Sequence, residues 1–142
     1  MGKKYEEEGI IKNGSKMLNA IANSEVPIIT LIIGSSYGAG NFAMCGRSIK
    51  PRFLFSYPNS KNSVMGPDQI SGVLKMISKN ENDYEKLKND IEFQSQPFYT
   101  SGKMWDDGII DPRETRTYLS ICLEVFSQTY SKINNNYGVF RF

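Results

Sequence analysis

The sequence predicts an α/β fold in which parallel strands alternate with helices, and three observations lead to this prediction. A continuous apolar run at residues 28–33 is typical of a strand that is buried on both faces. A glycine-rich segment and a run of helix-forming residues follow it directly. A second unit of strand, turn and helix then occupies residues 52–76 in the same order. Two such units in succession favour a parallel sheet with helix amino termini along one edge.

The apolar run at 28–33 is the centre of this prediction. A proline precedes it, and most of its residues are β-branched, which favours a strand over a segment of buried helix. The pattern breaks at the glycine-rich segment 34–40, which is expected to form a turn. A helix is expected to begin near Gly40 or Asn41 and to continue to Cys45, because no helix-breaking residue interrupts it.

The turn before that helix has the features of an anion-binding site. The first amides of a helix have no intrahelical partner and lie at the positive end of the helix dipole. Gly38, Ala39 and Gly40 can expose N–H groups there because no large side chain blocks the approach of a ligand. The spacing matches neither G-x-G-x-x-G nor G-x-x-x-x-G-K-[ST]. The alternative interpretation is that these glycines only permit a sharp turn and close helix packing.

Residues 9–24 are predicted to form an amphipathic helix with one buried face. The apolar positions are spaced by three and four, as on one side of a helix. These positions are Ile10, Ile11, Gly14, Met17, Leu18, Ile21 and Ala22. Glycine is costly within a helix, so close packing against a neighbour is the expected reason for Gly14.

The second unit is predicted to contain a strand at 52–57, a short strand at 63–65 and a helix from Pro67 to about Met76. Proline is favoured at the first position of a helix, and an acidic residue suits the first turn. The following segment, 78–96, is the most polar part of the chain. It is expected to form a surface helix with a thin apolar edge.

A strong helix start follows the aromatic segment 98–110. Asp111 as the cap, Pro112 at the first position and Glu114 three residues after the cap match a capping box. The apolar face of the predicted helix consists of Leu119, Cys122, Leu123, Val125, Phe126 and Tyr130. A metal site on Asp106, Asp107 and Asp111 is the less favoured interpretation, because one carboxylate caps the helix and no further oxygen ligands follow the pattern.

Composition excludes several classes of function. The chain has 142 residues, a net charge of +2 and no histidine, and its basic residues form no stripe of the kind that binds nucleic acid. Catalysis by Ser-His-Asp or Cys-His groups within this chain is therefore excluded. Cys45 and Cys122 are expected to be buried thiols in a reducing compartment. No run is apolar and long enough for a membrane span, and the charged start of the chain lacks the pattern of a targeting signal.

Several separated blocks resemble the carboxyl-terminal half of the carboxyltransferase (β) subunits of methylcrotonyl-CoA carboxylases. The blocks are I-I-G-S-S-Y-G-A-G-N-F-A-M-C-G-R at 32–47, P-R-F-L at 51–54, S-V-M-G at 63–66, W-D-D-G-I-I-D-P at 105–112 and Y-G-V-F-R-F at 137–142. They occur in the order of the family and extend the resemblance over almost the whole chain. The first block is more similar to the methylcrotonyl and geranyl types than to the propionyl type.

The resemblance implies a crotonase-like fold, a spiral of ββα units, and transfer of a carboxyl group from carboxybiotin to an acyl-CoA. Backbone amides stabilise the developing negative charge in such enzymes, which requires neither histidine nor a metal. By position, the amides of Ala39 and Gly40 would polarise the ureido oxygen of biotin. Two further sets of residues are implied, Tyr37 and Gly38 to shape the turn, and Val64, Met65 and Gly66 to line the adjoining biotin pocket.

The resemblance also implies partners. The whole of 1–142 corresponds to a carboxyl-terminal type carboxyltransferase domain, and the amino-terminal half, which holds most of the acyl-CoA, is absent from it. Biotin would be carried by a partner α subunit, and β subunits would form a homo-oligomer in the mitochondrial matrix of a eukaryote or in the cytoplasm otherwise. No metal, nucleic-acid or membrane partner is expected. Two alternatives stay open, a catalytically silent remnant that keeps the fold and subunit interface, and, with less support, an enoyl-CoA hydratase or isomerase.

Overall fold

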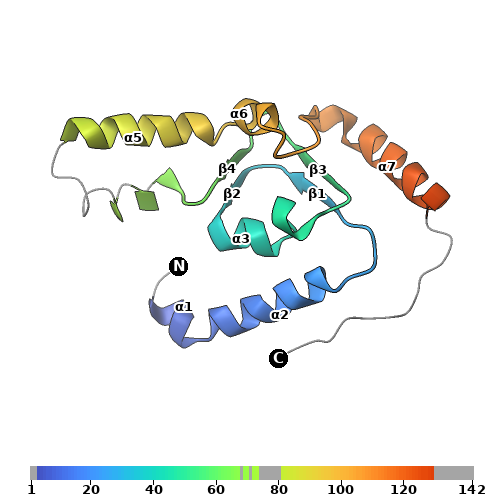
Figure 1. The fold of residues 1–142 in the computed structure, drawn as a ribbon, viewed down its shortest axis with the longest axis horizontal. Coiled ribbons are helices and arrows are strands. Elements are labelled where there is room, and N and C mark those ends of the chain that lie inside the picture. Colours follow the sequence, from blue (N-terminus) through green and yellow to red (C-terminus); the bar gives the residue numbers. More distant parts are fainter. Residues whose placement is uncertain (1–2, 68, 71, 74–80, 130–142) are drawn as a thin grey trace.

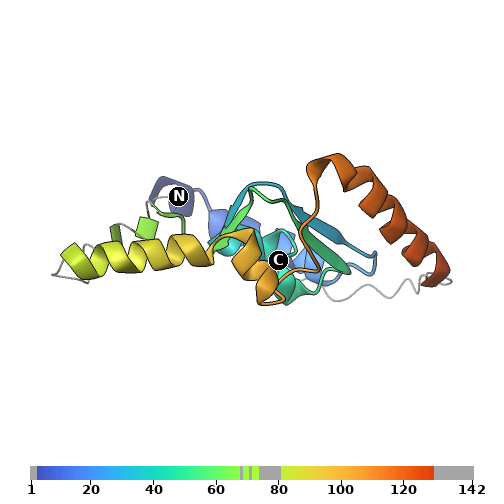
Figure 2. The same ribbon diagram turned by 90° about the horizontal axis from the view of Figure 1, so that it is seen from above.

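A computed structural model describes residues 3–67, 69–70, 72–73 and 81–129. Helices and short parallel strands alternate along the chain, in an elongated arrangement with α5 and α7 reaching toward opposite ends (Figures 1 and 2). The α-helices are α1 (Lys3–Glu7), α2 (Ile10–Ala22), α3 (Gly38–Ala43), α5 (Glu81–Gln94), α6 (Pro97–Gly102) and α7 (Thr115–Thr129). The strands are β1 (Ile29–Ile32), β2 (Ser35–Tyr37), β3 (Phe53–Ser56) and β4 (Lys61–Ser63), and the 3₁₀ turns are η1 (Arg47–Ile49) and η2 (Pro112–Glu114).

The predicted parallel α/β arrangement is confirmed. β1 pairs with β3 in parallel, from Ile29 opposite Phe53 to Ile32 opposite Ser56. β2 pairs with β4, also in parallel, with Tyr37 opposite Ser63. β1 ends at Ile32 and β2 begins at Ser35, so the chain passes almost directly from the β1–β3 sheet into the β2–β4 sheet (Figure 1).

The prediction of a turn throughout 34–40 is wrong, because residues 35–37 form β2 and α3 begins at Gly38 rather than near Gly40. A strand of three residues flanked by glycines carries no local pattern, and its pairing is supplied by β4, which is distant in sequence. The expected strand at 63–65 is correspondingly displaced to 61–63. The helix expected from Pro67 is present at residues 67, 69, 70, 72 and 73, and its other positions lie outside the described residues.

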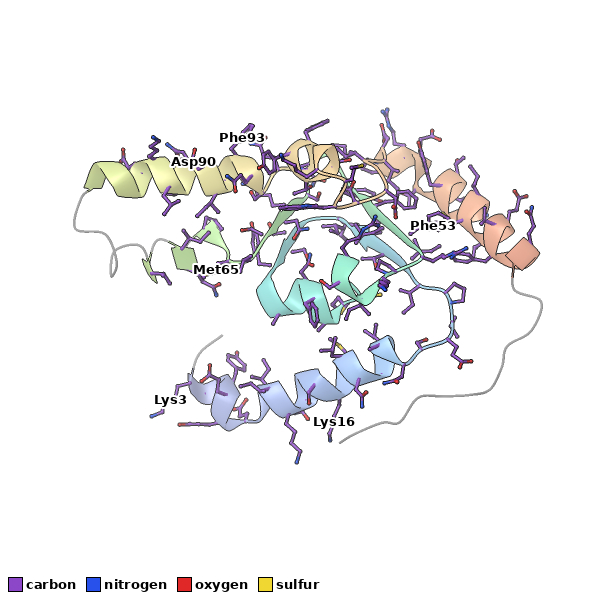
Figure 3. The ribbon with its side chains drawn as sticks, viewed as in Figure 1. Lys3, Lys16, Phe53, Met65, Asp90 and Phe93 are labelled. Carbon is purple, nitrogen blue, oxygen red and sulfur yellow. The ribbon has the colours of Figure 1, made fainter. Side chains whose placement is uncertain are left out.

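The core forms where β3 meets α7 and the segment before it. Phe55, Ile110 and Cys122 make up its buried cluster. Phe53 extends the core toward α7, because its ring stacks on Phe55 and on Phe126 with centroid separations of 6.0 and 5.7 Å. Figure 3 shows Phe53 on the side of the sheet that faces α7. The apolar face predicted for α7 is confirmed at Cys122 and Phe126, which are buried, and wrong at Leu123, which is 60% exposed, while Tyr130 lies outside the described residues.

The predicted buried face of α2 is wrong for this chain. No residue of α2 is buried, and Ile11 keeps 75% of its surface exposed. The physical reason is the size of its neighbour, because α3 has six residues and α2 has thirteen. At about 1.5 Å per residue, α3 covers less than half of the length of α2. Lys16 on the same helix points away from the rest of the molecule (Figure 3).

The predicted cap of the last helix is present in a modified form. The Asp111 side chain accepts a hydrogen bond from the Arg113 N–H at 2.9 Å, and η2 then leads into α7. The Glu114 N–H donates to the Asp111 carbonyl instead of joining a reciprocal capping box. Among the described residues, no helix combines the length and apolar character that a bilayer crossing requires. Cys45 and Cys122 are both buried free thiols.

Candidate functional site

The candidate site lies where β2 passes directly into α3. Tyr37 ends the strand in an extended conformation, and Gly38 begins the helix with φ +58°. A side chain is disfavoured at Gly38 by this left-handed conformation. A Cβ atom there would also lie 2.9 Å from the carbonyl oxygen of Val64. Glycine is therefore required at position 38 both by the backbone conformation and by the packing against Val64, which directly follows β4.

Ala39 and Gly40 form the first turn of α3, and both are exposed. The N–H groups in the first turn of a helix have no intrahelical partners. No described residue accepts a hydrogen bond from the N–H of Ala39 or Gly40. A Cβ atom built on Gly40 meets nothing within 4 Å, and its φ is not in the left-handed region. The first turn of α3 is thus open to an approaching molecule.

The second predicted segment lies beside the first. Val64, Met65 and Gly66 follow β4, whose last residue pairs with Tyr37. Gly66 lies close under the Tyr37 ring, because a Cβ atom at Gly66 would be 3.4 Å from Tyr37 Cδ2. The structure therefore brings together the two sequence-predicted segments that are separated in the chain.

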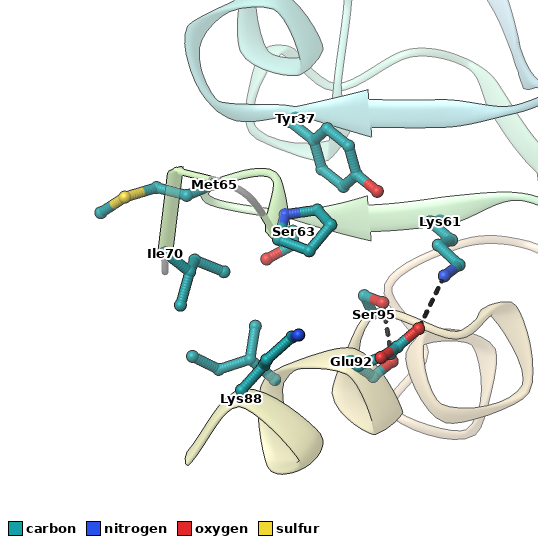
Figure 4. A pocket seen from close by; sticks show the side chains of 10 residues that line it. Tyr37, Lys61, Ser63, Met65, Ile70, Lys88, Glu92 and Ser95 are labelled. Atoms are coloured by element: carbon teal, nitrogen blue, oxygen red, sulfur yellow. Dashed lines mark hydrogen bonds and ion pairs between the residues drawn. The ribbon is translucent and has the colours of Figure 1, made fainter. Parts of the chain in front are cut away.

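A small hollow with about 10 Å³ of space for a water-sized molecule, partly open to solvent, adjoins this junction (Figure 4). Tyr37 and Met65 line it on one side, and α5 closes it on the other. The lining on this side includes the apolar Ile91 of α5 and four charged or polar residues, Lys61, Lys88, Glu92 and Ser95. Lys61 Nζ lies 3.1 Å from Glu92 Oε1, so one of the two lysines is paired across the hollow. Ala39 and Gly40 do not line this hollow.

The contribution of α5 was not predicted from the sequence. The polar composition of 78–96 indicated only a surface helix, and the helix itself is confirmed as Glu81–Gln94. The available signal was the apolar edge that includes Ile91, which lines the hollow together with Ile70. An apolar edge fixes which side of a helix faces the protein, but it does not indicate which segment that side meets.

Asn41 is a second residue whose role was not predicted. Its side-chain amide donates to Ser36 Oγ at 2.9 Å and to Asn62 Oδ1 at 3.1 Å, so it ties α3 to both strands of the second sheet. Gly46 packs against it, because a Cβ atom there would lie 2.6 Å from Asn41 Oδ1 and 2.8 Å from Asn41 O. These contacts explain why asparagine and glycine occur at these two places in the 32–47 block.

The aspartates of the 105–112 block have structural partners. Asp107 accepts hydrogen bonds from the Leu54 N–H at 2.8 Å and from Arg47 Nη1 at 3.1 Å. The buried Asp106 accepts from Ser56 Oγ at 2.7 Å. The hydrogen bonds and charge of Arg113 lower the pKa of Asp111 to about 2. In the part of the chain that the structure describes, no group of three or more histidine, cysteine, aspartate or glutamate residues is arranged to hold a metal ion.

Comparison with known proteins decides the family. The family model described as the carboxyl transferase domain matches residues 1–139. This chain belongs to the carboxyl transferase family. The β subunit of geranyl-CoA carboxylase from P. aeruginosa superimposes on this chain with a TM-score of 0.83 and 40% sequence identity. The match covers 100% of this chain and 29% of that subunit. The expected crotonase-like carboxyltransferase fold is thereby confirmed.

Curated relatives of the carboxyl transferase family agree with this assignment. A probable biotin-dependent acyl-coenzyme A carboxylase beta2 subunit of Mycobacterium tuberculosis is 45% identical over 99% of this chain. The mitochondrial methylcrotonoyl-CoA carboxylase beta chain of Dictyostelium discoideum is 42% identical over the same share. The chain spans 29% of the length of the first relative and 26% of the second. The resemblance to methylcrotonyl-CoA carboxylase β subunits is therefore confirmed for a segment of the family's longer chains.

Proposed function

We propose that this chain is the part of a biotin-dependent acyl-CoA carboxyltransferase that binds the ureido oxygen of biotin. The observation that carries the proposal is the pair of exposed amides at Ala39 and Gly40, which lack partners among the described residues. They follow directly from Gly38, whose backbone is fixed against Val64. Such preorganised donors stabilise negative charge without reorientation during the reaction.

Biotin, carried by a partner α subunit, would supply the carboxyl group that is transferred. Toward it, Ala39 and Gly40 donate hydrogen bonds to the oxygen on which charge develops. Tyr37 and Gly38 hold the turn in place through their contacts with Gly66 and Val64. Val64 and Met65 offer apolar surface beside the turn, since both are exposed. The described groups that act on biotin are thus backbone amides, which suits a chain without histidine.

The acceptor proposed is 3-methylcrotonyl-CoA, an intermediate of leucine breakdown. Relatives from Dictyostelium discoideum and Arabidopsis thaliana, at 42% and 38% identity, carry the name methylcrotonoyl-CoA carboxylase beta chain, and one from Drosophila melanogaster, at 42%, carries the name probable methylcrotonoyl-CoA carboxylase beta chain. The acyl-CoA would be held mainly by the amino-terminal half of the carboxyltransferase, which residues 1–142 do not include. The β subunits would assemble as a homo-oligomer, as in the transcarboxylase 12S hexamer, and in a eukaryote they would lie in the mitochondrial matrix.

The test is carboxyl transfer in a reconstituted complex. The chain is combined with the rest of a matching β subunit, biotin and methylglutaconyl-CoA, and decarboxylation of the CoA ester is measured. Gly40→Val is expected to lower the rate by about 100-fold or more, the order of magnitude that accompanies loss of an oxyanion donor. Gly102→Val is the matched control, because a Cβ atom at Gly102 also meets nothing within 4 Å.

Full activity of the Gly40→Val complex would contradict the role of the α3 turn. No decarboxylation by the wild-type complex, under conditions in which the intact relative is active, would instead favour a catalytically silent chain. The unfolding temperature of each variant shows whether a loss of activity reflects the site or the fold. Because Gly40 has open space around it, little loss of stability is expected.

A further inference from the structure

Lys88 of α5 brings a positive charge to the hollow beside Tyr37. Its side chain is half-buried, although Leu87 and Asn89 on either side of it are exposed. Lys88 lines the hollow, and Figure 4 shows its side chain extending from α5 toward Ser63. A lysine on the solvent-facing side of a helix would instead direct its ammonium group into water. The direction of Lys88 therefore favours a negatively charged neighbour inside the hollow.

The acidic residues nearest to Lys88 on the helix do not supply that neighbour. Side chains three or four positions apart can pair on a helix, which for Lys88 means Glu85 and Glu92. Glu92 Oε1 lies 3.1 Å from Lys61 Nζ and thereby ties α5 to β4. The ion pairs of the described residues include neither Glu85 nor Lys88. Two lysines and one glutamate line the hollow, so one positive charge is left over.

Ser63 adds a neutral donor on the opposite side of the hollow. It is the last residue of β4, pairs with Tyr37 and is half-buried. Its hydroxyl has no hydrogen-bond partner among the described residues, whereas the Ser95 hydroxyl donates to the Glu92 carbonyl at 2.7 Å. An ammonium group and an available hydroxyl that face the same space are the donors that a carboxylate accepts.

The size and walls of the hollow limit what can bind there. Its space of about 10 Å³ corresponds to roughly one water-sized group, and one side is open to solvent. A single charged oxygen can enter while the rest of its molecule stays outside. The buried Ile70 and the side chains of Met65 and Ile91 surround the space with apolar surface. Attraction between opposite charges is stronger where water is scarce.

We propose that Lys88 and Ser63 form a binding site for a small carboxylate, one oxygen of which enters the hollow. The carboxylate comes either from a small free acid or from the carboxyl group that biotin carries. The second source rests on the proposed function, because Ser63 directly precedes Val64, whose carbonyl lies against Gly38. The site itself requires only the charge of Lys88 and the hydroxyl of Ser63.

Sodium formate, the smallest carboxylate, provides a direct test on the 142-residue chain. The Lys88 ammonium resonance and the Ser63 amide resonance are expected to shift saturably as formate is added. Sodium sulfate at the same ionic strength is the control, because a bulky divalent anion does not fit a space for one water-sized group. Its addition is expected to shift neither resonance saturably.

Two lysine substitutions on α5 separate local binding from total charge. Lys88→Met is expected to weaken formate binding by about 10-fold or more, the loss that accompanies removal of a charged hydrogen-bond donor. Lys86→Met removes the same charge from an exposed position that does not line the hollow. Its binding is expected to stay within about twofold of the wild type, because exposed charges are screened. Ser63→Ala is expected to weaken binding by about 2- to 10-fold.

Three results would overturn the proposal: no saturable shift with formate, the same shifts with sulfate, or equal weakening by Lys86→Met and Lys88→Met. The source of the carboxylate is then decided in the reconstituted complex. If biotin carries it, formate slows decarboxylation of methylglutaconyl-CoA by the wild type more than by Lys88→Met. An unchanged rate assigns the site to a free acid. Formate binding in a complex that transfers no carboxyl group would contradict the proposed function and leave the carboxylate site intact.

Discussion

The guanidinium of Arg47 lies 3.1 Å from the carboxylate of Asp107, and this contact joins the two sequence blocks that carry most of the family resemblance. The other carboxylate oxygen of Asp107 accepts the Leu54 N–H of β3. One aspartate therefore holds the turn after α3 and the edge of β3 at a fixed separation. The Arg47 side chain is half-exposed, whereas the hydrogen bond from Leu54 to Asp107 is partly buried.

Substitution of Arg47 and substitution of Asp107 are expected to lower the free energy of unfolding by unequal amounts. Arg47→Ala should lower the free energy of unfolding by about 1 kcal/mol or less, because exposed ion pairs contribute little. Asp107→Ala should lower it by about 1–3 kcal/mol, because the Leu54 N–H loses its acceptor in a shielded position. Urea unfolding of the two variants measures both values. Equal losses would show that the ion pair, and not the hydrogen bond to β3, is the main contribution of Asp107.

Gly38 and Gly40 are expected to respond differently to the same substitution. Gly38→Ala should lower the free energy of unfolding by about 1–3 kcal/mol, because the added methyl group meets Val64 O in a left-handed backbone. Gly40→Ala should raise it by about 0.4–1 kcal/mol, because the site is open and the unfolded chain loses freedom. Thermal unfolding of the Gly38→Ala and Gly40→Ala proteins measures both changes in stability. A destabilised Gly40→Ala protein would mean that position 40 tolerates no side chain.

Gly46 is expected to control the position of Asn41. Gly46→Ala should destabilise the protein by about 1–3 kcal/mol, because its methyl group would overlap Asn41. The side-chain amide resonances of Asn41 should shift at the same time, since its hydrogen bonds to Ser36 and Asn62 are disturbed. Gly102→Ala is the control, with open space at its Cβ position. Unchanged Asn41 resonances in the Gly46→Ala protein would refute the steric argument.

Asp111 is expected to titrate at unusually low pH. The hydrogen bonds from Arg113 lower its pKa from 3.8 to about 2, so the folded protein binds this proton less readily than the unfolded chain. The resulting stabilisation is present above about pH 4 and is lost as the pH falls toward 2. Carboxyl chemical shifts should give a midpoint near 2 in the wild type and a higher midpoint in Arg113→Gln, which removes the side-chain hydrogen bond and the charge but keeps the backbone N–H of residue 113. An unchanged midpoint in that variant would exclude Arg113 as the cause.

The sequence was sufficient where the determining forces are local. The apolar run that became β1 and the Asp111-Pro112 start of the last helix both depend on residues within a few positions of each other. β2 escaped prediction because its partner β4 lies far along the chain, and three residues carry no periodicity. The prediction that one face of α2 is buried was wrong, because an apolar stripe on a helix does not indicate how much of that stripe other segments of the same chain cover.

The same distinction applies to the candidate site. The two segments around Gly38 and Val64 were predicted from the family resemblance, and the structure places them side by side. The roles of Asn41 and of the α5 residues Lys88 and Glu92 depend on contacts between distant segments. No local pattern in a single sequence encodes such contacts.

The bridge between Ser56 and Ile109 has a consequence for biosynthesis. β3 cannot acquire its neighbour on that side until the ribosome has released Ile109, well after β3 itself has emerged. At about 5–20 residues per second, this delay lasts seconds. Folding of this sheet is therefore expected to wait for the synthesis of Ile109, with the nascent Phe53–Ser56 segment available to chaperones in the meantime.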